Sequence, residues 1–412
     1  MNAFTVYLIL KFSSSLLFSM VFTVNLVYHL TVVELNPLQL VLIGTILEAT
    51  VFIFEIPTGV LADTKSRRLS VIIGYVLIGL GFLLEGSFPF FWAVALAQVV
   101  WGFGYTFTSG ATQAWIADEV GDERAREAFL RGAQAGQIGG LLAIPISVAL
   151  GRLNVALPIA CGGGLMMALA AFLTVAMPEE RFRPVPAENR ATWTVMLKTV
   201  SDARQLVRRQ PILLTLLGIV WFYGLYSEGF DRLWTAHLLE GFSAPLVSAL
   251  EPVVWFGAIR GVQLIIGLIA TEIARRHLHS YRSAGVARVL MSSAGLIVVG
   301  LAAFGLSRSV WMAIVMYWLV SALRHIRAPL YDAWFNQCID DSQVRATLFS
   351  VSSQVDAIGQ ICGGPIAGTI GNVVSIRAAL VASAAMLSPV LPLYRLALRR
   401  GARRGTVGAH TE

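Results

Sequence analysis

The sequence predicts an all-α membrane protein with twelve transmembrane helices in two pseudo-symmetric six-helix bundles. Of its 412 residues, 56% are hydrophobic and only 13% are charged, and the mean hydropathy is +0.71. No soluble core of this size needs so much apolar surface. About twelve apolar runs approach the roughly 20 residues with which a helix crosses a hydrocarbon core. In addition, motifs of the first half of the chain recur in the second half, which predicts related halves.

The first bundle is predicted to occupy residues 1–177 and the second residues 211–398. The expected spans of the first are Val6–Leu30, Leu38–Ala62, Leu69–Gly86, Phe90–Ala117, Ala128–Leu150 and Val155–Met177. Those of the second are Ile212–Leu239, Leu246–Ile273, Ala284–Leu306, Val310–Gln337, Ala346–Ile370 and Val373–Leu398. The stretch 178–210 has too many charges to insert, so it is interpreted as a cytoplasmic linker, with room for a short amphipathic helix around Thr194–Val207.

Basic residues are distributed very unevenly between alternate loops. One set of loops, together with the tail 399–412, holds most of them, whereas the opposite loops hold only Arg152, Arg308 and Arg377. Because basic loops near membrane segments stay on the cytoplasmic side, both termini are predicted to be cytoplasmic. A basic surface facing anionic lipid accounts for the net charge of +7, so no nucleic-acid partner is expected. The first apolar run is too long for a signal core and is expected to remain as the first helix.

The sequence lacks patterns that would indicate catalysis. Cys161, Cys338 and Cys362 fall within or at the end of apolar spans, so neither a disulfide framework nor a metal site is predicted. Nucleophile–base spacings and phosphate-binding glycine loops are also missing. We therefore expect no enzyme, no cofactor and no metal.

Two groups of residues recur between the halves. The turn GVLADTKSRR at residues 59–68 aligns with GLIATEIARR at 267–276, which keeps the glycine, the alanine and both arginines. The Ala-Trp pair at 114–115, followed by Arg126 and Gly140, aligns with the pair at 333–334, followed by Arg345 and Gly359. Two such matches at constant offsets are typical of an internally repeated transporter.

The turn at 59–68 closely resembles the signature loop between the second and third transmembrane helices of the major facilitator superfamily. The resemblance implies a transporter in which this loop is a conformational latch that holds the two halves together in the outward-facing state. It also implies that an acidic residue at the end of the fourth helix joins the latch. The candidate latch residues are Gly59, Asp63, Arg67, Arg68 and Asp118.

The latch residues have a physical rationale of their own. Gly59 would let backbones approach closely, and Asp63 can accept hydrogen bonds from a neighbouring helix N-terminus. Arg67 and Arg68 can pair with acidic groups across the turn. The alternative is a solvated basic turn that only fixes the topology.

Charged residues deep in the spans form a second set of candidates, because an ionised group in a bilayer is costly unless it is paired or hydrated. A carboxylate in a partly apolar cavity can take up and release protons as access alternates. The proton-coupling candidates are Glu48, Glu55, Glu228 and Asp356. The remaining buried charges either form static ion pairs between helices or line a substrate cavity. They are Asp231, Arg232, Arg260, Arg324, Arg327 and Asp332.

The segments 55–63, EIPTGVLAD, and 224–234, GLYSEGFDRLW, resemble bacterial drug and proton antiporters of the macrolide-efflux type. This implies proton-coupled multidrug efflux of small amphipathic compounds across a bacterial inner membrane, by a protein that can work as a monomer in the lipid bilayer. Gln98 departs from the pattern, because proton-coupled members commonly carry an arginine in the fourth helix. His29, near the outer end of the first span, is interpreted as a bystander.

Two alternative functions remain open at this stage. One is the transport of a single specific metabolite, which a dedicated polar cavity would favour. An aromatic, loosely polar cavity would instead suit a bulky, apolar or cationic compound. The other alternative is a non-transporting membrane receptor or scaffold with the same fold.

Overall fold

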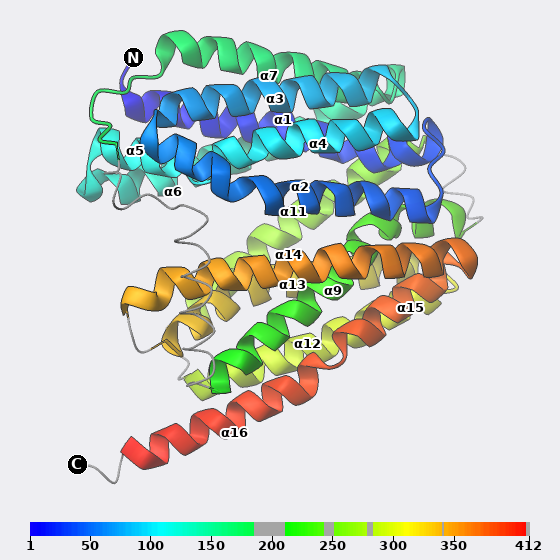
Figure 1. Cartoon of the computed structure of the whole chain (residues 1–412). Helices are drawn as coiled ribbons and strands as arrows, with labels where there is room; N and C mark the ends of the chain where they lie inside the picture. The colour runs from blue at the N-terminus through cyan, green and yellow to red at the C-terminus, as the bar shows by residue number, and fades with distance from the viewer. Residues whose placement is uncertain (185–210, 243–250, 278–282, 340–341, 409–412) are drawn as a thin grey trace. The chain divides into compact units, whose positions relative to one another are not determined.

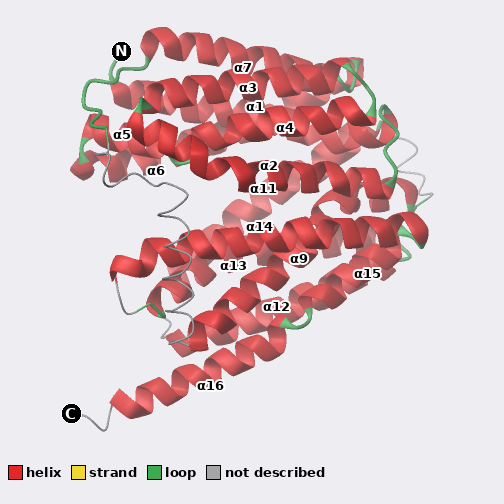
Figure 2. Cartoon of the chain, in the orientation of Figure 1, coloured by secondary structure: helices red, strands yellow, loops and turns green. Residues whose placement is uncertain are grey.

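The computed structural model describes residues 1–184, 211–242, 251–277, 283–339 and 342–408. Every regular element in these ranges is an α-helix (Figure 2). Helices suit apolar segments because they satisfy their backbone hydrogen bonds internally. The amphipathic helix expected around Thr194–Val207 lies outside the described residues.

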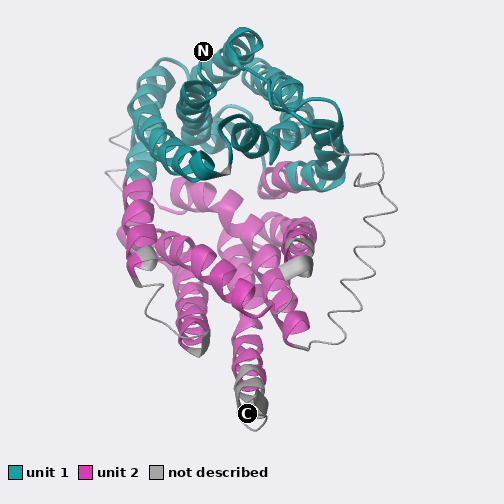
Figure 3. Cartoon of the chain, turned by 90° about the vertical axis from the view of Figure 1, so that its left-hand side faces the viewer, with its two compact units in different colours: residues 1–36, 46–195, 245–261 teal, residues 37–45, 196–244, 262–412 magenta. Residues whose placement is uncertain are grey.

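The chain divides into two compact units (Figure 3). Unit 1 comprises residues 1–36, 46–195 and 245–261, and unit 2 comprises residues 37–45, 196–244 and 262–412. The second helix and the helix that begins at Pro252 each contribute residues to both units.

The first seven helices supply most of unit 1 (Figure 1). They are α1 (Ala3–Thr31), α2 (Pro37–Thr64), α3 (Arg67–Ser87), α4 (Phe91–Thr108), α5 (Ala111–Val120), α6 (Asp122–Leu153) and α7 (Leu157–Ala176). Helix α1 packs along α6 and α7, and α3 packs along α4 and α7. Glycine permits the close approach of α3 to α4, because a Cβ on Gly104 would lie 2.7 Å from the carbonyl oxygen of Gly74.

The remaining helices supply most of unit 2. They are α9 (Pro211–Glu240), α11 (Pro252–His277), α12 (Ser283–Leu306), α13 (Val310–Gln337), α14 (Ser342–Val373), α15 (Ile376–Leu387) and α16 (Val390–Gly408). Helix α9 packs against α14, α15 and α16, while α12 packs against α13, α15 and α16. Helix α9 is therefore covered by several neighbours, and 67% of the residues in its most apolar stretch are buried.

Two of the predicted spans are interrupted. The fourth span was expected to be continuous from Phe90 to Ala117, but it breaks at Ser109 and Gly110 into α4 and α5. Gly110 has φ +72°, a conformation that glycine adopts without strain. The last span breaks between α15 and α16 at Pro389, which cannot continue the hydrogen bonding of a preceding helix.

The described helices match the twelve predicted spans when α4–α5 and α15–α16 are each taken as one span. Nine helices in the described ranges are long and apolar enough to cross a membrane by length and composition alone. Helices α13 and α14 are not among these nine. Their polar content includes Arg324, Arg327 and Asp332 on α13 and Asp356 on α14, so the least apolar spans carry several of the candidate site residues.

Candidate functional site

The predicted site residues lie mainly in two clusters, one in each unit. The first, which we call the turn cluster, consists of Asp63, Arg67, Arg68, Asp118, Glu119 and Glu179 in unit 1. The second, which we call the charge–aromatic cluster, consists of Tyr223, Tyr226, Glu228, Asp231, Arg232, Arg324, Arg327 and Tyr331 in unit 2. Within the described residues, no group of three or more His, Cys, Asp or Glu side chains could hold a metal ion.

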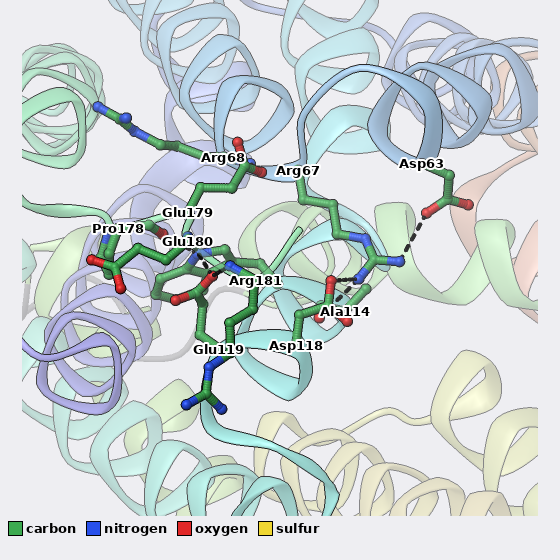
Figure 4. Close-up of polar contacts among 11 residues, drawn as sticks. Asp63, Arg67, Arg68, Ala114, Asp118, Glu119, Pro178, Glu179, Glu180 and Arg181 are labelled. Carbon is green, nitrogen blue, oxygen red and sulfur yellow. Dashed lines mark hydrogen bonds and ion pairs between the residues drawn. The ribbon is translucent and has the colours of Figure 1, made fainter. Parts of the chain in front are cut away.

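Arg67 is the centre of the turn cluster (Figure 4). It is the first residue of α3, and its guanidinium donates hydrogen bonds to Asp118 and, at 3.1 Å, to the carbonyl oxygen of Ala114. The same group lies 3.4 Å from Asp63 at the end of α2. Its side chain is only 15% exposed, whereas that of Asp63 is 50% exposed. Arg67 thus joins α2, α3 and α5 through one partly buried guanidinium, in which the Asp118 contact is the closer one.

Glu179, which the sequence reasoning missed, holds the beginning of α3. Its carboxylate accepts hydrogen bonds from the backbone N–H of Arg68 at 2.9 Å and from the hydroxyl of Ser66 at 2.5 Å. Ser66 is the N-cap of α3 and accepts from the N–H of Leu69. These residues satisfy the free donors of a helix N-terminus, the role that the sequence assigned to Asp63. Glu179 was assigned to the linker, although a carboxylate directly after a span was the available signal.

Helix α5 is tied to the segment that follows α7. Glu119 accepts hydrogen bonds from the backbone N–H groups of Glu180 and Arg181, each at 2.9 Å. The indole of Trp115 donates to the carbonyl oxygen of Pro178 at 2.6 Å. Trp115 belongs to the repeated Ala-Trp pair, so one of the repeated residues has a cross-linking contact in this half.

Two expectations for the turn were wrong. A Cβ added to Gly59 would meet no atom within 4 Å, so no close backbone approach explains this glycine. The side chain of Arg68 donates to the carbonyl oxygen of Thr174 at 2.5 Å rather than to an acidic group.

Asp231 and Arg324 form a two-pronged ion pair in the charge–aromatic cluster. The distances from Arg324 Nη1 to Asp231 Oδ1 and from Nη2 to Oδ2 are 2.5 and 2.7 Å. The guanidinium also lies over the rings of Phe230 and Tyr226, with its carbon 5.5 and 5.8 Å from the ring centroids. Such bidentate and stacked contacts fix the orientation of an arginine more strictly than a single ion pair does.

Glu228 and Arg232 form a second ion pair one helical turn apart on α9. The Nε–Oε2 distance is 3.2 Å, and the side chain of Glu228 is 5% exposed. Gly44, in the part of α2 that belongs to unit 2, lies directly against this pair. A Cβ at Gly44 would overlap Glu228 Oε2 and Arg232 Nε. Only glycine therefore fits at this position without moving the pair.

Arg327 lies on the same face of α13 as Arg324, three residues away. Its guanidinium carbon is 3.6 Å from the centroid of Tyr223 and 5.6 Å from that of Tyr331. Among the described residues, Arg327 forms no ion pair with a carboxylate. Its guanidinium instead lies against tyrosine rings. A guanidinium in this setting can bind an anionic group by donating hydrogen bonds to it, or it can stack on a planar group.

Other candidates are less closely joined to the two clusters. Asp356 on α14 accepts a hydrogen bond from Gln360 at 2.9 Å, and Asp332 is exposed near the end of α13. Glu48, Glu55 and Arg260 are half-buried and belong to unit 1, so they lie outside the charge–aromatic cluster.

A third polar group, missed by the sequence reasoning, lies fully inside unit 1. His29 Nε2 is 2.8 Å from Glu85 Oε1, and Gln98 Nε2 donates to Glu85 Oε2 at 3.0 Å. Trp101 in turn donates to Gln98 Oε1 at 3.0 Å. His29 is therefore not the lone histidine that the sequence suggested. Glu85 could have been found, because it is a carboxylate inside the third apolar span and such a group needs a partner.

A family model described as Major Facilitator Superfamily matches residues 4–319 of the chain. The chain belongs to the major facilitator superfamily. It is therefore a multi-pass membrane protein and a secondary transporter rather than an enzyme, as the sequence predicted. The superfamily prediction is confirmed by this match, and the resemblance of the turn at 59–68 was sufficient to find it.

Curated relatives and solved structures are consistent with this membership. An uncharacterized MFS-type transporter, YxaM, from Bacillus subtilis (strain 168) is 23% identical over 369 residues, which cover 87% of each chain. The MFS efflux pump atnC of Emericella nidulans is 26% identical over 341 residues, 76% of this chain and 64% of the pump. A crystal structure of the nucleoside transporter NupG has a TM-score of 0.79 at 15% identity and covers 96% of this chain and 99% of its own. An inward-facing bacterial homologue of the lysosomal transporter Spinster has a TM-score of 0.73 at 14% identity, with coverage of 97% and 96%. These structures share the fold.

Proposed function

We propose that this transporter exports small amphipathic compounds in exchange for protons. The charge–aromatic cluster is the observation that carries the proposal. Its ion pairs are Asp231–Arg324, between α9 and α13, and Glu228–Arg232, within α9, and the rings of Tyr226 and Phe230 flank the guanidinium of Arg324. Aromatic faces bind apolar and cationic compounds, while a carboxylate such as Glu228 can carry the exchanged proton. The similarity to the efflux pump of Emericella nidulans supports the outward direction.

The turn cluster is proposed to act as the latch of the transport cycle. Arg67 already joins three helices of unit 1 through Asp63, Asp118 and Ala114. A change of the carboxylate partners at this point would alter how α2, α3 and α5 are held, which is the kind of discrete rearrangement that alternating access requires. On this proposal the turn faces the cytoplasm of a bacterial cell, together with both termini.

Arg327 supports a second candidate function, the transport of one specific metabolite that carries an anionic group. Its guanidinium lies over Tyr223 and Tyr331, and it is not joined to a carboxylate by an ion pair in the described part of the chain. A carboxylate or phosphate of a substrate would complete the hydrogen bonding of such a group. This candidate predicts selectivity for one anionic compound instead of a broad range of amphipathic cations.

Transport into and out of sealed vesicles tests both candidates. The assay measures the movement of lipophilic cations, macrolide-like compounds and small anionic metabolites, with and without an imposed pH gradient. Glu228→Gln and Glu48→Gln are the test variants, and Glu272→Gln, which alters an exposed carboxylate on α11, is the matched control. Gradient-dependent movement of several amphipathic compounds that Glu228→Gln or Glu48→Gln abolishes would establish the exporter. Movement of a single anion would favour the second candidate, and no gradient dependence for any compound would reject proton exchange.

A further inference from the structure

An acid and a base are buried together in unit 1, apart from both clusters of charges described above. His29 lies two residues before the end of α1, and Glu85 lies two residues before the end of α3. Their side chains are 1% and 2% exposed, and the Nε2–Oε1 distance is 2.8 Å. The tilted rings of Phe82 and Trp101 pack nearby, with their centroids 5.5 Å apart. A titratable pair in such a place is costly unless it is structurally or functionally required.

Hydrogen bonds determine which atoms can carry a proton. The indole N–H of Trp101 can only donate, so its partner, Gln98 Oε1, accepts. The amide nitrogen of Gln98 consequently donates to Glu85 Oε2, which is an acceptor whether the carboxyl group is ionised or not. The hydroxyl of Tyr28 donates to the backbone carbonyl of Glu85 at 2.8 Å and leaves the carboxyl group free. One shared proton therefore lies between Glu85 Oε1 and His29 Nε2.

The second ring nitrogen of His29 completes the arrangement. His29 Nδ1 is buried and has no hydrogen-bond partner among the described residues. When Nδ1 is bare, Nε2–H donates to an ionised Glu85 and the pair has one negative charge. When Nδ1 takes a proton, the shared proton can move from Nε2 to Glu85 Oε1, which leaves a neutral imidazole, a neutral carboxylic acid and no net charge. One proton is thus gained at Nδ1 and stored on Glu85.

The groups that face this pair from neighbouring helices do not supply a competing charge. Helix α1 contributes Tyr28, and α4 contributes the uncharged Gln98 and Trp101 and, further along, Tyr105. Helix α7, which packs against α1 and α3, carries Cys161 as its titratable residue.

Two other charged residues near the same ends of these helices are either paired elsewhere or exposed. On α6, which packs against α1, Arg152 is paired with Glu251 at 2.9 Å. Glu34, in the segment after α1, is exposed. The proton on the pair is therefore controlled by His29, Glu85 and Gln98 themselves.

We propose that His29 and Glu85 form a proton-binding site of this transporter, with His29 Nδ1 as the entry atom, Glu85 as the store, and Gln98 and Trp101 as positioning residues. The site is additional to Glu48, Glu55, Glu228 and Asp356. Its use as the coupling site rests on the proposed proton exchange, whereas the binding of the proton does not. Because the pair is closed from solvent in this structure, uptake and release require a rearrangement of its surroundings.

Infrared difference spectroscopy of the purified, detergent-solubilised protein tests proton binding directly. A step between about pH 5 and about pH 9 should produce a carboxylic-acid carbonyl band at the acid end. The Glu85→Gln variant should lose this band and keep its fold, because the glutamine amide can accept from Gln98 and donate to His29 Nε2. Gln98→Met should shift the band to higher frequency, because the carbonyl oxygen of the acid loses its donor. Glu272→Gln, which alters the carboxylate paired with Arg276 on α11, is the control and should leave the band unchanged.

A band that persists unchanged in Glu85→Gln would overturn the proposal. If Glu85→Gln fails to fold, the Gln98→Met shift decides, and an unshifted band in that variant would also overturn it. Coupling is then measured in proteoliposomes as the stimulation of transport by a pH gradient, which Glu85→Gln should abolish. Loss of the infrared band without any gradient-driven transport in the wild type would retain the proton site and reject the proposed function. If a pH gradient stimulates transport by Glu85→Gln as fully as transport by the wild type, the site binds a proton but is not the coupling site.

Discussion

In unit 1 the two arginines of the repeated turn, Arg67 and Arg68, begin α3, whereas in unit 2 the corresponding Arg275 and Arg276 lie near the end of α11. Arg67 is 15% exposed and reaches two other helices. Arg276 is 72% exposed and pairs at 2.7 Å with Glu272 on its own helix. The spacing of the basic residues has therefore survived in both halves, while the cross-links between helices differ.

The acidic partners explain this difference. At the offsets that align the two halves, Thr271 stands at the position of Asp63, and Gln337 stands at the position of Asp118. Neither residue can form an ion pair with an arginine. Unit 2 instead has its charges inside the spans, as the pairs Asp231–Arg324 and Glu228–Arg232 show. The ion pairs that join different helices therefore lie at helix ends around Arg67 in unit 1 and within the helices α9 and α13, at Asp231–Arg324, in unit 2.

The largest expected effect follows from breaking the Asp231–Arg324 pair in unit 2. Arg324→Met leaves Asp231 without its bidentate partner and should lower the free energy of unfolding by about 1–3 kcal/mol, a value discounted for partial exposure. Transport should fall at least about tenfold if the pair positions substrate, since each 1.36 kcal/mol changes a rate by about tenfold. Thermal unfolding in detergent and vesicle transport measure the two quantities.

The double variant Asp231→Asn with Arg324→Met separates structure from transport. It removes both charges, so stability should recover relative to Arg324→Met, while transport stays low. Recovery of both quantities would show that the pair is a static link between α9 and α13.

Gly44 and Gly59 are both on α2 but have opposite surroundings. Gly44→Ala should cost about 1–3 kcal/mol, because its Cβ would overlap Glu228 and Arg232 and force that pair to move. Gly59→Ala should be neutral or should stabilise the helix by about 0.5–1 kcal/mol, because the added Cβ meets open space. Melting temperatures of the two variants provide the comparison. A loss of transport in a stable Gly59→Ala protein would indicate that Gly59 is packed in another state of the cycle.

Asp118 and Asp63 should differ in their importance for Arg67. Asp118 makes the closer contact and is less exposed than Asp63, so Asp118→Asn should destabilise unit 1 by about 1 kcal/mol, more than Asp63→Asn does. Both variants should insert in the membrane and show impaired transport if the turn cluster is a latch. Wild-type transport by both well-folded variants would leave the cluster with a purely structural role.

Sequence reasoning found the architecture because apolar length, basic loops and a recurring motif are local patterns. It also found every charged member of the charge–aromatic cluster, since an ionised residue inside an apolar span is visible in the sequence. It could not find the partners of these residues. The contact of Gly44 with Glu228 and that of Glu179 with the start of α3 depend on packing between segments far apart in the chain. The breaks at Ser109 and Pro389 were missed because each was taken as part of one long span, although Gly110 and Pro389 are residues that commonly end helices.

The smallest expected effect compares the repeat counterparts Arg68 and Arg276. Arg68→Gln removes a hydrogen bond to the carbonyl oxygen of Thr174 and should cost about 1 kcal/mol. Arg276→Gln removes only an exposed pair within one helix and should change the free energy of unfolding by less than about 0.5 kcal/mol. Raising the salt concentration should reduce the already small effect at Arg276 further, because exposed charges are screened. Equal losses at both positions would mean that the basic residues of unit 2 have partners of the same strength as those of unit 1, and the division between helix-end pairs and pairs within the spans would then not hold.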